Sequence, residues 1–141
     1  MTSLTNKQAT MDPKSAYIYA KEVIKGRFPE GEAAIATKLN NAVRYAAVCI
    51  KGRWPKLESK FAGNPDIAYR YARSVIKGRW PEGEDAIASD PKTAYEYAMN
   101  VIKGRWKEGE AAIANDPVVK KDYKSFLREL AKWSKVGKKT N

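Results

Sequence analysis

Hydrophobic and polar positions along the chain recur with a period of 26 residues. Lys-Gly-Arg followed by an aromatic residue occurs four times, with the glycines at Gly26, Gly52, Gly78 and Gly104. The same register aligns prolines, alanines, isoleucines and five tyrosines, which are Tyr19, Tyr45, Tyr71, Tyr97 and Tyr123. A fixed period of this length is typical of repeat proteins, in which each unit stacks on its neighbours.

Each unit is predicted to be a pair of helices. Asp12-Pro13 has the form of a helix start, because the Asp side chain accepts from free amides of the first turn and proline loses no hydrogen bond there. Equivalent starts are Asn64-Pro65, Asp90-Pro91 and Asp116-Pro117. Apolar residues follow at helical spacing, at Ala16, Tyr17, Ala20, Val23 and Ile24. Gly26 stands where we expect a left-handed C-terminal cap, and Pro29 begins a shorter second helix.

Two helices of about 13 and about 8 residues cannot close a core alone, so consecutive pairs must stack. The sequence therefore predicts an all-α fold, a small α-solenoid of four two-helix repeats with a C-terminal capping helix. The expected repeats are 12–38, 39–64, 65–90 and 91–116, followed by the capping helix 117–134. We expect residues 1–11 to be disordered and residues 135–141 to form a basic, flexible tail.

The run Ala-Tyr-x-Tyr-Ala-x-x-Val-Ile-Lys-Gly-Arg-Trp-Pro-Glu-Gly-Glu, found at 94–110 with Lys107 in place of proline, resembles short helical repeats in uncharacterised proteins of bacteriophages and related mobile elements. The resemblance covers about residues 12–117. It implies a viral origin and expression in a bacterial host, and it supplies no catalytic residues. The second repeat departs most, with Lys56, Leu57 and Phe61 where other repeats have Glu, Gly and Ile.

The net charge of +11 suggests an acidic partner, and the excess is local. Residues 65–90 and 91–116 are almost neutral, whereas 39–64 carry +4 and 117–141 carry +6. Candidate contacts to a partner or to phosphates are therefore Arg44, Lys56, Lys60, Lys120, Lys121, Lys124, Arg128 and Lys132. A solvated basic face is the alternative interpretation of the same residues.

The repeated signature has a binding interpretation and a structural one. Stacked repeats would place Lys25, Lys51, Lys77 and Lys103 in a row with steps of about 10 Å, suited to phosphates. The tryptophans would then offer stacking surfaces for bases. We favour a structural role, with each arginine pairing to nearby glutamates and each aromatic ring wedged between helices. This structural signature comprises Gly26, Arg27, Phe28, Gly52, Arg53, Trp54, Gly78, Arg79, Trp80, Gly104, Arg105 and Trp106.

Catalytic and metal chemistry have little support in the sequence. The chain has no histidine, and its single cysteine, Cys49, takes a register position held elsewhere by valine. We therefore expect no enzyme, no metal site and no cofactor. No apolar stretch reaches the roughly 20 residues that cross a bilayer, and the first residues lack a secretory pattern, so we expect a cytoplasmic location, that of the bacterial host for a phage protein.

The sequence thus favours a non-enzymatic helical-repeat protein that binds a host or viral protein. Two alternatives stay open: a nucleic-acid-binding accessory protein that acts through its basic clusters, and a component of the virion. Self-association is open as well, because the end of a solenoid can pair with another copy.

Overall fold

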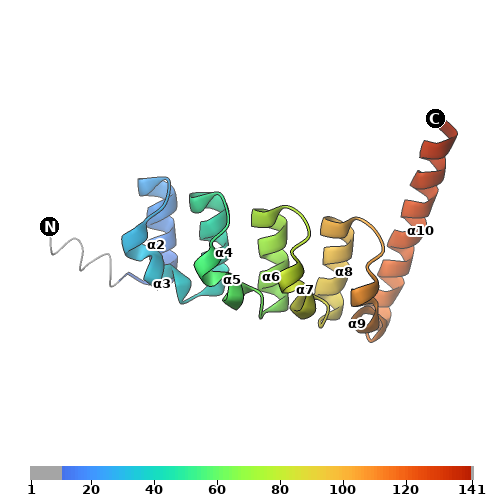
Figure 1. Cartoon of the computed structure of the whole chain (residues 1–141), viewed down its shortest axis with the longest axis horizontal. Helices are drawn as coiled ribbons and strands as arrows, with labels where there is room; N and C mark the ends of the chain where they lie inside the picture. Colours follow the sequence, from blue (N-terminus) through green and yellow to red (C-terminus); the bar gives the residue numbers. More distant parts are fainter. Residues whose placement is uncertain (1–10, 141) are drawn as a thin grey trace.

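The computed structural model describes residues 11–140, with side chains through residue 135. Four helix pairs stand in a row in chain order, and a long helix closes the row (Figure 1). This arrangement confirms the predicted all-α solenoid. Residues 1–10 and 141 lie outside the described part, and with them all of the predicted N-terminal disordered segment except Met11.

The first helix of each pair has an α-helical part and a π-helical end. The α-helical parts are α2 (Pro13–Tyr19), α4 (Leu39–Tyr45), α6 (Pro65–Tyr71) and α8 (Pro91–Tyr97). The π-helical ends are Ala20–Ile24, Ala46–Ile50, Ala72–Ile76 and Ala98–Ile102. The second helices are α3 (Glu32–Ala36), α5 (Pro55–Phe61), α7 (Pro81–Ile87) and α9 (Glu110–Ala114). Short 3₁₀ turns, Pro29–Gly31 and Lys107–Gly109, precede α3 and α9.

The predicted helix starts are present. The side chains of Asp12, Asn64 and Asp90 accept hydrogen bonds from backbone amides three residues later, at distances of 2.7 to 3.1 Å. The carboxylate of Asp116 accepts from two amides at the start of the last helix. The second repeat begins at Lys38, which makes no side-chain cap bond.

The left-handed cap is displaced by one residue from our expectation. Lys25, not Gly26, has a positive φ of 59°, and its three equivalents have φ of 60° to 61°. The cause is the π-helical end, where the amides of Lys25 and Gly26 both reach the carbonyl of Ala20, at 2.7 and 3.3 Å. The chain therefore reverses at the lysine, and no glycine in the described residues has a positive φ.

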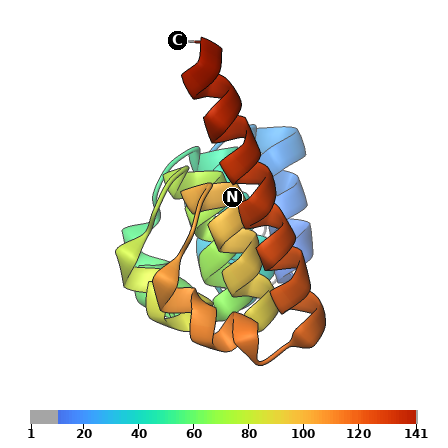
Figure 2. The same cartoon turned by 90° about the vertical axis from the view of Figure 1, so that its right-hand side faces the viewer.

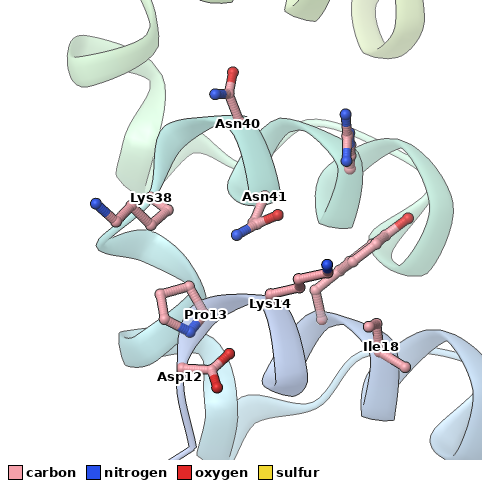
Figure 3. A pocket seen from close by; sticks show the side chains of 9 residues that line it. Asp12, Pro13, Lys14, Ile18, Lys38, Asn40 and Asn41 are labelled. Atoms are coloured by element: carbon pink, nitrogen blue, oxygen red, sulfur yellow. The ribbon is translucent and has the colours of Figure 1, made fainter.

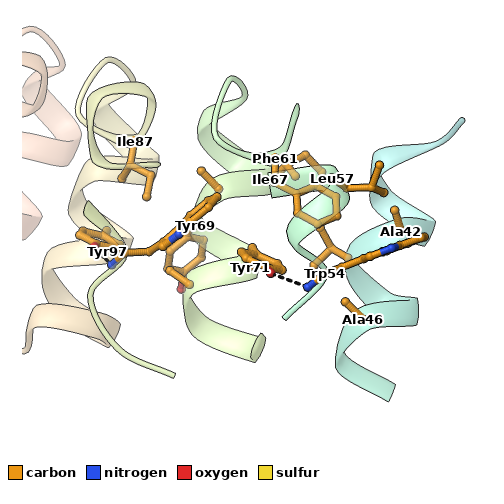
Figure 4. Packing of buried hydrophobic residues seen from close by; sticks show 14 of the residues in the cluster. Ala42, Ala46, Trp54, Leu57, Phe61, Ile67, Tyr69, Tyr71, Ile87 and Tyr97 are labelled. Atoms are coloured by element: carbon orange, nitrogen blue, oxygen red, sulfur yellow. Dashed lines mark hydrogen bonds between the residues drawn. The ribbon is translucent and has the colours of Figure 1, made fainter. Parts of the chain in front are cut away.

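Small residues let the two helices of a pair approach closely. Ala68 on α6 is fully buried, and a Cβ added to Gly83 of α7 would lie 3.0 Å from the Ala68 Cβ. The same added atom would lie 2.6 Å from the Trp80 ring. Glycine is thus required there by space, and the aromatic ring fills the gap between helices, as Figure 4 shows for Trp54 in the preceding repeat.

The two ends of the array differ from our expectations. The helical spacing predicts a buried face for Val23 and Ile24, but they are 61% and 43% exposed. Cys49, the register equivalent of Val23 in the second repeat, is buried. The difference arises because no repeat packs against this side of the first one within the described residues. At the other end, the capping helix α10 (Pro117–Thr140) continues six residues past its expected end at 134. It extends well beyond the other helices (Figure 2).

Candidate binding surface

A hydrogen-bonded latch joins each repeat to the next. In the third repeat, Arg79 donates from Nε and Nη2 to the two carboxylate oxygens of Glu84, both at 2.9 Å. The hydroxyl of Tyr97, on the following helix α8, donates to Glu84 at 2.6 Å and accepts from the Trp80 backbone amide at 2.9 Å. One carboxylate therefore orders its own turn and holds the next helix in register.

The latch occurs four times along the array. Its members, in the order Arg, Glu, Tyr and aromatic amide, are Arg27–Glu32–Tyr45–Phe28, Arg53–Glu58–Tyr71–Trp54, Arg79–Glu84–Tyr97–Trp80 and Arg105–Glu110–Tyr123–Trp106. Figure 4 shows the bond between Tyr71 and the Trp54 amide. Within the described residues, no repeat precedes Tyr19 and its hydroxyl makes no such bond.

In the second, third and fourth latches, the pKa of the glutamate is lowered and the pKa of the tyrosine is raised. Hydrogen bonding from Arg79 holds the pKa of Glu84 below its usual value, and arginines act in the same way on Glu58 and Glu110. Burial, followed by the bond to the glutamate, raises the pKa of Tyr71 and of Tyr123 to about 12. The ionised glutamate and the neutral tyrosine are thus the forms that the fold stabilises.

The stability of the array should consequently be highest between about pH 5 and pH 10. A lowered glutamate pKa gives stability that is present above the unfolded value of about 4.3 and is lost as the pH falls through the folded value. A raised tyrosine pKa gives stability that is present below about pH 10 and is lost as the pH rises through about 12. Urea unfolding at several pH values measures this window. Tyr71→Phe should reduce the alkaline loss, and an equal loss in that variant would contradict the assignment.

The aromatic residues of the signature are enclosed. Trp80 and Trp106 are 1% exposed, and Phe28 and Trp54 are 2% and 4% exposed. Each ring packs against the tyrosine of its own repeat, with ring centroids 4.8 to 5.2 Å apart. The signature therefore presents no exposed indole on which a base can stack.

The lysines of the signature remain at the surface. Lys25, Lys51, Lys77 and Lys103 are exposed, and we call this row the lysine edge. Within the described residues, none of the four makes an ion pair, whereas each neighbouring arginine is paired to a glutamate. Each lysine directly follows a π-helical segment, so the four cations lie at the same end of successive helices, where Figure 1 shows the connecting loops.

The basic residues predicted as contacts do not come together in one site. Arg44 of α4 lines an open hollow of about 640 Å³ between α2 and α4, together with Lys14 and Lys38 (Figure 3). Lys56 and Lys60 are exposed on α5, the second helix of the second repeat. The remaining candidates, Lys120, Lys121, Lys124, Arg128 and Lys132, all lie on α10 and are exposed.

Helix α10 adds a mixed apolar and basic surface. The first helix of the fourth repeat ends at Ile102, and the register equivalent of Ile102 on α10 is Arg128. Because α10 continues to Thr140, its residues after Arg128 extend past the ends of the other helices. Trp133 lies in this extension and is 69% exposed. Lys132 pairs with Glu129 at 3.3 Å, and Lys135 is exposed.

Other chemical features of the described residues are few. Cys49 is buried, and burial raises the pKa of its thiol. The described Cys, Asp and Glu side chains form no cluster of three or more that would suit a metal ion. No helix in residues 11–140 has both the length and the apolar character that a membrane span requires.

Comparisons with protein-family models, curated proteins and solved structures found no match for this chain. The candidate surface is therefore assigned from its geometry alone. Sequence reasoning predicted contacts on the basic last helix and gave the lysine row as its less favoured interpretation, and it missed the part played by the tyrosines. The available signal was their constant spacing, 17 residues after each signature aromatic and 13 after each latch glutamate.

Proposed function

We propose that the protein is a non-enzymatic helical-repeat scaffold that binds an acidic protein along the lysine edge. The observation that carries this proposal is that the repeated Lys-Gly-Arg-aromatic signature separates into residues used by the fold and a lysine that is not. In every repeat the arginine is paired and the aromatic ring is buried, while the lysine is exposed without an ion pair among the described residues. The repeated element that remains for a partner is thus a row of four cations.

The backbone at the lysine edge supports a functional role. A left-handed conformation costs a residue with a side chain roughly 1–2 kcal/mol, and asparagine or glycine adopts it more readily. A cation at a helix C-terminus recovers about 0.3–1 kcal/mol at most exposed sites, which offsets part of the cost. An unfavourable conformation retained in all four repeats is the kind of strain that accompanies functional positions.

A protein partner suits the surface better than a nucleic acid does. The buried tryptophans are not available for stacking, which sequence-tolerant single-strand binding uses. The extension of α10 places exposed Trp133 among basic residues, and tryptophan is enriched in protein interfaces. A nucleic-acid accessory role is the second candidate, because a row of lysines also fits phosphates.

Affinity capture with matched variants tests the proposal. The bait is the whole chain, and its resemblance to phage repeats makes bacterial lysate the first source of a partner. The test variant carries Lys51→Asn, Lys77→Asn and Lys103→Asn, which keeps a residue suited to the left-handed corner. The control variant carries Lys14→Asn, Lys38→Asn and Lys92→Asn, at exposed positions away from the edge, and loses the same three charges. A fourth bait neutralises Lys120, Lys121, Lys124 and Arg128.

We expect the unmodified chain to capture an acidic protein that nuclease treatment does not release. The control variant should capture the same amount of this protein. The edge variant should capture at least about tenfold less, as expected when interface hot spots are lost. The bait with the neutral α10 should show a partial loss. Capture that disappears with nuclease, or that falls steeply with salt and equally in both asparagine variants, would favour nucleic acid instead. Equal retention of one protein by both asparagine variants would contradict a role for the lysine edge.

A further inference from the structure

Helix α10 occupies the place of the first helix of a fifth repeat. Its Tyr123 makes the same latch as the other tyrosines, donating to Glu110 at 2.7 Å and accepting from the Trp106 amide at 3.0 Å. However, α10 has no π-helical end and no left-handed corner, and it runs straight to Thr140. Within the described residues, no fifth signature aromatic and no fifth second helix therefore cover α10.

The space that a fifth aromatic would fill is an open cavity. In each repeat the tyrosine ring packs against its own Phe or Trp. The described part of α10 supplies no such ring to Tyr123, which instead meets Tyr95 of α8 edge-on, with ring centroids 6.5 Å apart. A cavity of about 230 Å³ lies beside Tyr123, between α9 and α10. An apolar cavity of about 150 Å³ can hold benzene, so this one is large enough for an aromatic side chain.

The walls of the cavity combine an apolar floor with a basic rim. Ile113, Tyr123 and Leu127 give the floor, and Ile113 is almost completely buried. Lys120 and Lys124 line the cavity and are exposed, at positions where the repeats have fully buried alanines. Arg105 and Glu110 also line the cavity, and they are paired with each other. The two lysines are the cations left to meet an anionic ligand.

We propose that this cavity binds a segment of the partner protein in which an aromatic side chain is followed within a few residues by carboxylates. The chain itself contains a segment of this kind, because residues 80–84 read Trp-Pro-Glu-Gly-Glu and the ring of Trp80 packs on Tyr71, the register equivalent of Tyr123. A second folded copy does not fit this description, since its signature aromatics are buried and no carboxylate side chain follows its exposed Trp133 in residues 134–141. The inference rests on the proposed function in taking the ligand to be protein.

A synthetic peptide with the sequence of residues 79–87, Arg-Trp-Pro-Glu-Gly-Glu-Asp-Ala-Ile, is the probe. Fluorescence anisotropy of the labelled peptide should show saturable binding to the whole chain. A peptide with alanine in place of tryptophan should bind at least about tenfold more weakly, as expected for an aromatic anchor. A peptide with glutamines in place of its glutamates should bind more weakly and with less dependence on salt.

Variants of the protein locate the binding. Lys120→Glu with Lys124→Glu should weaken binding by about tenfold or more, as charge reversal at an interface does. The matched control, Lys14→Glu with Lys92→Glu, should leave it unchanged. Amide shifts of the unmodified chain on peptide addition give a readout that needs no variant, and they should centre on Ile113, Tyr123 and Leu127.

Three results would overturn the inference: no peptide binding, equal binding of the alanine peptide, or shifts centred away from the cavity. The test of the cavity is separable from the test of the lysine edge. The variant with Lys51→Asn, Lys77→Asn and Lys103→Asn is changed only outside the cavity lining, so it should still bind the peptide. Peptide binding without capture of an acidic protein would support the cavity as a binding site and contradict the proposed function. Capture of an acidic protein through the lysine edge without peptide binding would support the proposed function and contradict the cavity as a binding site.

Discussion

Replacing Trp80 with alanine should lower the free energy of unfolding by about 3–5 kcal/mol, the usual loss for a buried tryptophan. The side chain is 1% exposed, and its ring packs on Tyr71 with centroids 4.8 Å apart. The ring fills the space that Gly83 leaves beside it, so removing the ring opens a cavity in the centre of the array. Since single domains are stable by only about 5–15 kcal/mol, urea unfolding followed by circular dichroism should show a large fall in midpoint.

Trp80→Phe is the matched control for that variant. Phe28 occupies the same place in the first repeat, and the Trp80 Nε1 atom has no hydrogen-bond partner within the described residues. The phenylalanine variant therefore gives up ring volume without breaking a hydrogen bond, and its loss should be clearly smaller than that of alanine. Equal unfolding midpoints for the two variants would show that the ring is not a wedge between helices.

Tyr97→Phe should destabilise the array by about 1–3 kcal/mol, the cost of leaving a buried polar group without its partner. The hydroxyl is the acceptor for the Trp80 amide and a donor to Glu84, and Tyr97 is fully buried. Deleting one oxygen thus strands a backbone amide and removes the bond that joins two repeats. Urea unfolding measures the change, and hydrogen exchange at the Trp80 amide should become faster.

The same substitution at Tyr19 separates the latch from the loss of a hydroxyl in general. Tyr19 belongs to the same register, but in the part of the chain that the structure describes no repeat lies before it to supply a glutamate and an aromatic amide. We expect Tyr19→Phe to change the free energy of unfolding by no more than about 0.5 kcal/mol, as for ordinary surface changes. If Tyr19→Phe and Tyr97→Phe were equally destabilising, the latch would not explain the constancy of the tyrosine.

The architecture could be predicted because repeats stack locally. The 26-residue register and the Asp-Pro starts defined the helix pairs, and the structure has those starts at Asp12 and Asp90. The corner at Lys25 could not be read in the same way. Glycine is the usual left-handed residue, and no sequence rule indicates that the preceding helix widens into a π-helical end.

The candidate surface was only partly predictable for a related reason. Pairing of arginine with glutamate follows from sequence distance, whereas the bond from Trp80 to Tyr97 spans 17 residues and depends on how two helices pack. The cavity beside Tyr123 is open because α10 continues as a helix, where each repeat turns back and places its signature aromatic on the tyrosine. The basic residues at 120 and 124 were identified by charge alone, without their place on its rim.

Urea unfolding of the Lys51→Asn, Lys77→Asn, Lys103→Asn variant is the most direct test of the claim that the signature divides into a scaffold and an exposed row of cations. Asparagine tolerates the left-handed corner better than lysine does, and removing three like charges lowers repulsion along the edge. We predict a midpoint equal to or above that of the unmodified chain. A clearly lower midpoint would mean that the lysines stabilise the fold themselves, and that their fourfold repetition does not mark a binding surface.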